Sequence, residues 1–64
     1  MFMNIEVERL RRYMSRKKLA TSLSVNVDTL DDWISGRQAI PADKLRALSR
    51  LFGCSADYLL KERR

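Results

Sequence analysis

The sequence predicts an all-α domain made of five short helices. Its 64 residues are 45% hydrophobic, which is ordinary for a folded globule and too high for a disordered basic tail. Apolar residues recur at helical spacing along the chain, and no segment shows the alternation of a strand. Capping residues and glycines separate the helical segments. A chain of this length allows one domain, which we place at residues 1–64.

The first predicted helix runs from about Asn4 to Met14, with Asn4 as its N-cap. Val7, Leu10 and Met14 follow the spacing i, i+3, i+7, so they form one apolar stripe that we expect to face the core. Three arginines lie off this stripe and are expected to be solvated: Arg9, Arg11 and Arg12.

The second predicted helix covers about residues 16–23 and follows the N-cap Ser15. Its short buried face has the spacing i, i+1, i+4 and consists of Leu19, Ala20 and Leu23. Three cations crowd its first turn: Arg16, Lys17 and Lys18. Because the helix dipole disfavours cations at this end, we interpret their placement as serving a partner outside the chain.

The third predicted helix covers about residues 27–35, between the N-cap Asn26 and the stop Gly36. Since only Ser24 and Val25 separate the second helix from Asn26, the two helices must meet at a sharp angle. Leu30 and Trp33 define its buried direction, and three acids spread around the opposite side: Asp28, Asp31 and Asp32. Residues 26–36 carry a charge of −3 with no basic residue, whereas the whole chain carries +5.

The two closing helices are predicted at about residues 41–63. The fourth opens at Pro41, ends at Gly53 and has an apolar face of Leu45, Leu48, Leu51 and Phe52. The fifth follows the N-cap Ser55 and is expected to bury Tyr58 and Leu59.

Several classes of protein are excluded by composition. One cysteine and no histidine cannot build a Cys/His zinc set or an intrachain disulfide, which suits a reducing cytoplasm. No apolar run is long enough to span a bilayer, so no membrane partner is expected. With a small core and no histidine to act as a base, we expect neither enzymatic activity nor a cofactor or metal. The pI near 10 favours an anionic partner.

Residues 15–36 contain the ordered apolar set Leu19-Ala20, Leu23, Val25, Leu30 and Trp33, in which small Ala20 permits close approach of a crossing helix. This pattern resembles the helix-turn-helix of the Cro and lambda-repressor-like family. The stretch from Ile40-Pro41 to Leu59-Leu60 is similar to the closing helices of that family. The resemblance covers roughly residues 5–60.

The resemblance implies a compact five-helix lambda-repressor-like fold with the helix-turn-helix at about residues 16–35. It implies a DNA-binding transcriptional regulator, often from a phage or prophage, whose second motif helix lies in the major groove. Residues of the groove would be Val27, Asp28 and Asp32, with Asp31 on the same acidic face. Phosphates would be contacted from the start of the second helix and from the flanks of the third, by Arg16, Lys17, Lys18, Asn26, Arg37 and Gln38.

Four positions depart from the family pattern. Ser24 replaces the turn glycine and must bear any positive φ itself. Arg16 stands near the start of the second helix, where the family often has glutamine. Ile34 and Ser35 replace the acidic residue before the stop glycine.

The acidic third helix leaves alternative functions open. The first hypothesis is a homodimeric regulator that binds operator DNA, because phosphate contacts from the chain's many bases offset the three carboxylates and aspartate can accept a hydrogen bond from cytosine N4. The second is an antirepressor-like modulator whose acidic face binds the basic surface of a partner repressor. A toxin–antitoxin component or other assembly subunit is a third.

Overall fold

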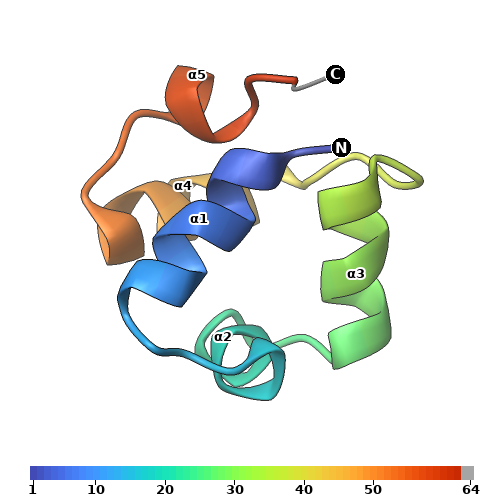
Figure 1. Cartoon of the computed structure of the whole chain (residues 1–64). Helices are drawn as coiled ribbons and strands as arrows, with labels where there is room; N and C mark the ends of the chain where they lie inside the picture. Colours follow the sequence, from blue (N-terminus) through green and yellow to red (C-terminus); the bar gives the residue numbers. More distant parts are fainter. Residues whose placement is uncertain (63–64) are drawn as a thin grey trace.

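The chain folds into five α-helices and has no strand within residues 1–62, the part that the computed structural model describes (Figure 1). The helices are α1 (Met3–Arg11), α2 (Arg16–Ser22), α3 (Val27–Ser35), α4 (Ala42–Phe52) and α5 (Ala56–Leu59). The predicted all-α class is confirmed. The last helix ends at Leu59, earlier than the predicted bound of about residue 63, which itself lies outside the described residues.

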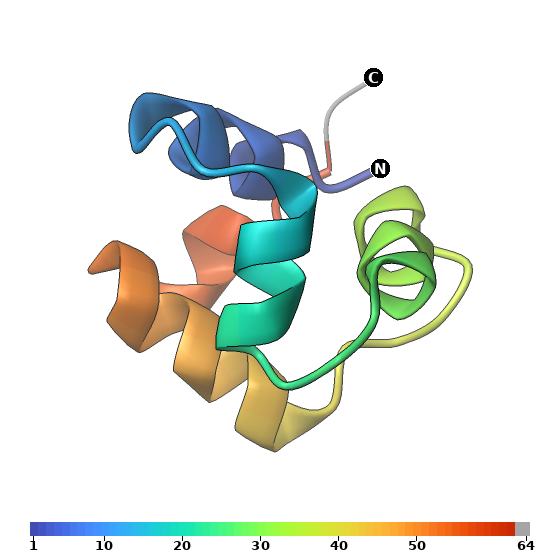
Figure 2. The ribbon, with the colours of Figure 1, turned by 90° about the horizontal axis from the view of Figure 1, so that it is seen from below.

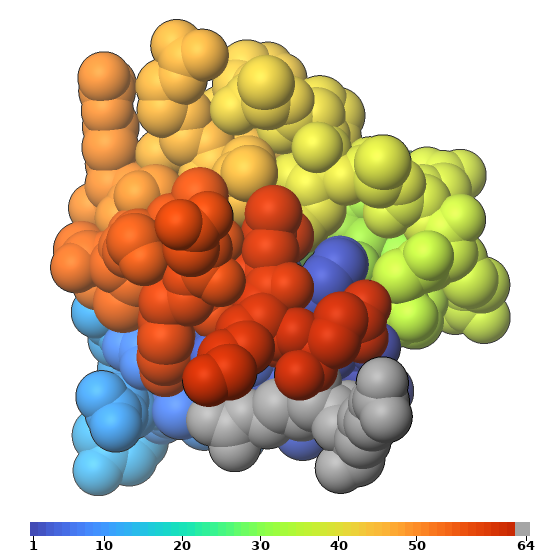
Figure 3. Space-filling model, turned by 90° about the horizontal axis from the view of Figure 1, so that it is seen from above, coloured from blue at the N-terminus to red at the C-terminus, as the bar shows by residue number. Residues whose placement is uncertain are grey.

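The helices pack around a small shared core. α2 packs on α3, α4 packs on α5, and α1 contacts both α3 and α5. Figure 2 shows α2 in the middle of the view with α1, α3 and α4 around it, and Figure 3 shows α5 lying over α1. All five helices contribute buried apolar side chains: Ile5, Leu19, Ala20, Leu23, Leu30, Trp33, Ile34, Leu48, Phe52 and Leu59. The predicted buried faces of α2 and α3 are confirmed, whereas Leu51 was wrongly placed in the core and is exposed.

Side-chain caps begin three of the helices, as the sequence predicts. The Ser15 hydroxyl accepts a hydrogen bond from the Lys18 amide at 3.0 Å, and the Ser55 hydroxyl accepts one from the Tyr58 amide at 3.1 Å. Asn26 caps α3 in the same way. Pro41, by contrast, adopts an extended backbone with ψ of 148° and precedes α4 instead of being its first residue.

The start and end of α1 differ from the prediction. The helix begins at Met3, so Asn4 is not its cap but an internal residue that is almost fully buried. The Asn4 side-chain amide donates to the carbonyl of Tyr58 at 2.7 Å and so ties α1 to α5. The helix ends at Arg11, and Tyr13 then takes a left-handed φ of 55°, which stops it before Met14.

The buried face of α1 is also not the predicted one. Leu10 is 59% exposed, whereas Ile5 and Glu8 are buried. Glu8 is stable there because it accepts hydrogen bonds from the Tyr58 hydroxyl at 2.8 Å and from Arg12 at 3.1 Å. These bonds satisfy the carboxylate, so α1 buries Glu8 beside Ile5. Of the predicted stripe, Met14 packs against the core as expected, Val7 is half-buried, and Leu10 faces solvent.

Two of the three arginines expected in solvent make structural contacts. Arg9 donates to Glu6 at 2.6 Å and to the carbonyl of Met14 at 2.7 Å. Arg12 donates to the carbonyl of Phe52 at 2.7 Å and lies over the Phe52 ring. Arg11 and Arg12 are both exposed as expected, although each also contacts Glu8, and the prediction is wrong only for Arg9.

Candidate nucleic-acid interface

A tight turn joins α2 to α3. Ser24 takes a φ of 59°, so the residue that replaces the turn glycine adopts the left-handed conformation expected of it. The Val25 amide donates back to the carbonyl of Ala20 at 3.0 Å. Ala20 is buried with only 2% of its surface exposed, and its small side chain lets α3 cross α2 closely.

A lysine from a distant helix supports this turn. The Lys44 ammonium of α4 donates to the carbonyl of Leu23 at 2.7 Å, where α2 ends. Carbonyls at a helix C-terminus lack intrahelical partners and attract cations, so this bond stabilises the end of α2. Sequence reasoning missed Lys44 because 21 residues separate it from Leu23 and no local pattern links the two.

The ends of α3 match the prediction residue for residue. The Asn26 side-chain oxygen accepts from the Thr29 amide at 2.8 Å, and Gly36 ends the helix at a left-handed φ of 86°. Leu30 and Trp33 point into the core. On the opposite side of the helix, Asp28 is exposed and Asp32 is half-buried. The expected division of α3 into an apolar inner side and an acidic outer side is therefore present.

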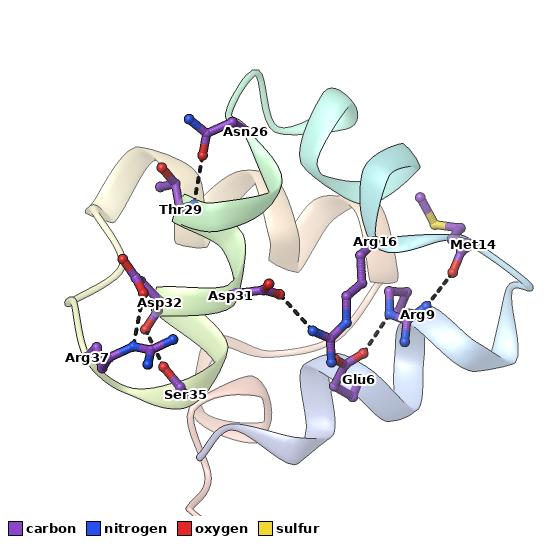
Figure 4. A network of polar contacts seen from close by, with 10 residues as sticks. All are labelled: Glu6, Arg9, Met14, Arg16, Asn26, Thr29, Asp31, Asp32, Ser35 and Arg37. Atoms are coloured by element: carbon purple, nitrogen blue, oxygen red, sulfur yellow. Dashed lines mark hydrogen bonds and ion pairs between the residues drawn. The ribbon is translucent and has the colours of Figure 1, made fainter.

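Two of the three carboxylates of α3 are paired with arginines. Asp31 accepts from Arg16 at 2.8 Å, and Asp32 accepts from Arg37 at 3.0 Å (Figure 4). In residues 1–62, Asp28 has no basic partner within ion-pair distance. The face is thus less acidic than the charge of −3 on residues 26–36 suggests, because both arginines lie outside the helix itself.

Arg16 connects three helices. Its guanidinium contacts Asp31 of α3 and Glu6 of α1, whose carboxylate also accepts from Arg9 (Figure 4). The Glu6 side chain is 9% exposed and that of Arg16 is 49% exposed. Arg16 therefore holds the start of α2 against α1 and α3, while about half of its side chain stays exposed. Glu6 was not singled out by sequence reasoning.

The remaining predicted phosphate contacts lie at the surface. Lys17 and Lys18, in the first turn of α2, are exposed and have no carboxylate within ion-pair distance among residues 1–62. Arg37 and Gln38 follow α3, and both of their backbone amides donate to the carbonyl of Asp32. These bonds fix the loop after α3 beside the end of the helix.

Other kinds of site are not evident in the described residues. No group of three or more His, Cys, Asp or Glu side chains there could hold a metal ion. Within the same part of the chain, no helix is long and apolar enough to cross a membrane. Cys54 is half-buried, and its thiol lies 3.4 Å from the carbonyl of Phe52.

Comparison with known proteins settles the family. A family model described as helix-turn-helix matches residues 5–59. The chain belongs to the helix-turn-helix family. Searches of curated proteins and of solved structures returned no match.

The helix-turn-helix family is one of DNA-binding transcriptional regulators of the Cro type, and the lambda-repressor-like fold of this chain agrees with it. In a helix-turn-helix, the second helix of the motif enters the major groove and the first crosses the backbone. The first and second helices of the motif in this chain are α2 and α3, since they flank the turn at Ser24.

Proposed function

We propose that the chain is a transcriptional regulator that binds operator DNA as a homodimer, with α3 in the major groove of each half-site. One observation carries the proposal: α2 and α3 cross at a fixed turn, and the side of α3 that faces away from the core is polar. The family match supports it. A dimer fits because one short helix contacts only a few base pairs and two half-sites multiply specificity.

Phosphate contacts come from the start of α2 and from both flanks of α3 in this proposal. Lys17 and Lys18 are free to neutralise phosphates at the start of α2. Asn26, Arg37 and Gln38 contact the DNA backbone beside the groove. Arg16 keeps its two carboxylates and offers the exposed part of its side chain to the same backbone.

Base recognition is assigned to the first half of α3. Asp28 is exposed and unpaired in the described chain, so its carboxylate is available to accept from the N4 amine of cytosine. Val27 packs partly against the core at the start of the helix, and in this proposal its exposed part contacts a thymine methyl group. Arg37 orients Asp32, and Arg16 orients Asp31. Because each arginine neutralises its carboxylate, the face of α3 presents less negative charge to DNA than three free aspartates would.

We further propose a repressor of phage or prophage type that acts in the cytoplasm without any enzymatic step. The gene beside this one then encodes a divergent regulator, which genome inspection tests directly. A neighbourhood without any regulator or phage gene counts against this origin, and leaves DNA binding itself unaffected.

A mobility-shift assay against DNA from upstream of its own operon tests the main proposal. We expect a specific complex whose affinity falls steeply as salt rises, because neutralised phosphates release counterions. A scrambled fragment of equal length is the control for specificity. If no genomic fragment is shifted even at low salt, the proposal is wrong.

One observation favours a second candidate, a modulator that binds a partner repressor. Asp28 is an exposed carboxylate with no intramolecular partner in residues 1–62, and a basic protein surface would satisfy it as well as cytosine does. In that case the chain regulates transcription by covering the DNA-binding face of its partner. The Asp28 substitution described in the Discussion separates the two candidates.

A further inference from the structure

We infer that two copies of the chain dimerise through the outer side of α1. We call this surface the α1 outer face and define it as Met1, Met3, Leu10 and the hollow beside them. The inference rests on the proposed function in one respect, namely that an operator with two half-sites requires two copies. The surface itself is argued from burial, shape and charge.

Three of the five large hydrophobic side chains exposed in residues 1–62 lie on this face, and the other two are Tyr13 after α1 and Leu51 on α4. Met1 is 55% exposed, Met3 37% and Leu10 59%. Met3 and Leu10 are seven residues apart and so lie on one side of the helix. The buried side of α1 carries Ile5 together with the polar Asn4, Glu6 and Glu8, so Met3 and Leu10 are left in solvent. Apolar side chains that cluster in solvent beside a hollow mark an interaction site.

A hollow of about 350 Å³ adjoins these side chains. It lies between α1 and the later part of α3 and is lined by Met1, Met3, Leu10 and Ile34, together with the ion-paired Glu6, Arg9 and Arg16. Leu10 lines this hollow and is also well exposed. One surface thus offers both a protruding side chain and a recess, as a two-fold contact needs when each copy inserts into the other.

The charge of this face is compatible with a second copy. The chain carries +5, so its faces with free cations repel another copy. On the α1 outer face the charged side chains pair internally: Glu6 pairs with Arg9 at 2.6 Å and with Arg16, and Arg16 also pairs with Asp31 at 2.8 Å. The face is therefore close to neutral, and two copies meet there without like-charge repulsion.

The position of the hollow also suits a dimer on DNA. Ile34 is the last but one residue of α3, whereas Asn26 and Asp28 are at the start. A two-fold axis beside the hollow brings the C-terminal ends of the two α3 helices toward each other. The N-terminal ends, which carry the proposed base contacts, then point outward to separate half-sites.

Analytical ultracentrifugation of the 64-residue chain tests the inference. We expect the wild-type chain to dimerise as its concentration rises, and Leu10→Glu to raise the dimer dissociation constant about tenfold or more, because the new carboxylate would be buried at the contact. Leu51→Glu is the matched control: Leu51 is 41% exposed but lies on α4, so this variant should dimerise like the wild type. Circular dichroism checks that each variant folds, and Met3→Glu replaces Leu10→Glu if the latter does not.

A wild-type chain that stays monomeric would overturn the inference and leave the α1 outer face to a different protein. So would a Leu10→Glu or Met3→Glu variant that dimerises as tightly as the wild type. Mobility shifts distinguish this failure from failure of the proposed function. If the dimer behaves as expected but binds no DNA, the surface stands and the operator-binding proposal fails. If the Leu10→Glu monomer still binds a single half-site, both stand.

Discussion

Arg16 donates to Asp31 at 2.8 Å, so the first residue of α2 is joined to the middle of α3. The same guanidinium contacts Glu6 of α1. One side chain thereby fixes the relative position of the two helices of the motif. It also lowers the negative charge that α3 would present to a DNA backbone.

Arg16→Met should destabilise the domain and weaken DNA binding together. We expect a loss of about 1 kcal/mol in the free energy of unfolding, because Glu6 is buried and loses one of its two basic partners. Urea denaturation measures this. Arg37→Met is the control, since its partner Asp32 is more exposed than Glu6 and the loss should be smaller. Equal losses in the two variants would contradict the role given to Arg16.

Ser24→Gly should stabilise the domain by up to about 1 kcal/mol. Serine is strained at a φ of 59°, and glycine adopts this conformation without a Cβ penalty. The gain is partly offset by the greater freedom of glycine in the unfolded chain. A rise in the thermal midpoint checks the prediction. Ser22→Gly, at the last residue of α2, is the control, and its thermal midpoint should fall.

Acid should destabilise the domain through Glu8. The hydrogen bond from Tyr58 and the one from Arg12 hold the pKa of Glu8 below its ordinary value. A carboxyl group with a lowered folded-state pKa stabilises the protein above its unfolded-state pKa of about 4.3, and that stability is lost as pH falls below it. Glu8→Gln should flatten the acid limb of a plot of stability against pH. A limb of unchanged steepness would show that another carboxylate controls it.

Alkali should also destabilise the domain, through the Tyr58 member of the same pair. The hydrogen bond to Glu8 raises the pKa of Tyr58 above its ordinary value of 10.0. A raised folded-state pKa means that the contribution is present below pH 10.0 and is lost as pH rises through the folded-state value. Tyr58→Phe should lower stability at neutral pH and remove this alkaline loss, which denaturant titrations at several pH values would reveal.

Asp28→Asn should change base preference as well as affinity. Asparagine pairs with adenine where aspartate accepts from cytosine, so we expect preference at one base pair of each half-site to move from cytosine to adenine, with a discrimination of about 1–3 kcal/mol. Asp57 is an exposed residue of α5, so Asp57→Asn changes the charge equally and should leave the base preference unchanged. If instead Asp28→Asn abolishes a complex with a partner repressor while nonspecific DNA affinity rises, the second candidate function is correct.

Lys17→Ala combined with Lys18→Ala should weaken binding to all sequences alike. Removing two phosphate contacts should reduce the slope of log affinity against log salt by about 2. Arg50→Ala serves as the control, because Arg50 is exposed near the end of α4, away from the motif. A change in sequence preference would show that the lysines contact bases.

The helix-turn-helix could be predicted closely from the sequence because its signals are local. Asn26 and Gly36 bracket α3 within eleven residues, and the spacing of Leu30 and Trp33 fixes its inner side. Each signal depends on neighbours within a few turns. Local physics therefore decides this part of the fold.

The orientation of α1 could not be predicted, because it depends on pairs far apart in the chain. Glu8 meets Tyr58 across 50 residues, and Asn4 meets the Tyr58 carbonyl across 54. The stripe of Val7, Leu10 and Met14 was wrong for Leu10, because hydrogen bonds stabilise the burial of Asn4 and Glu8 instead. The pairing of Asp31 with Arg16 could not be predicted for the same reason, so the sequence suggested a more acidic face of α3 than the structure has.

Lys44 has a consequence for protein engineering. Its bond to the Leu23 carbonyl makes α4 a brace for the α2–α3 corner. A chimera that transplants residues 16–35 alone onto a foreign scaffold leaves this brace behind. Only a host with a cation at the equivalent place on its fourth helix should then hold the transplanted corner at its original angle.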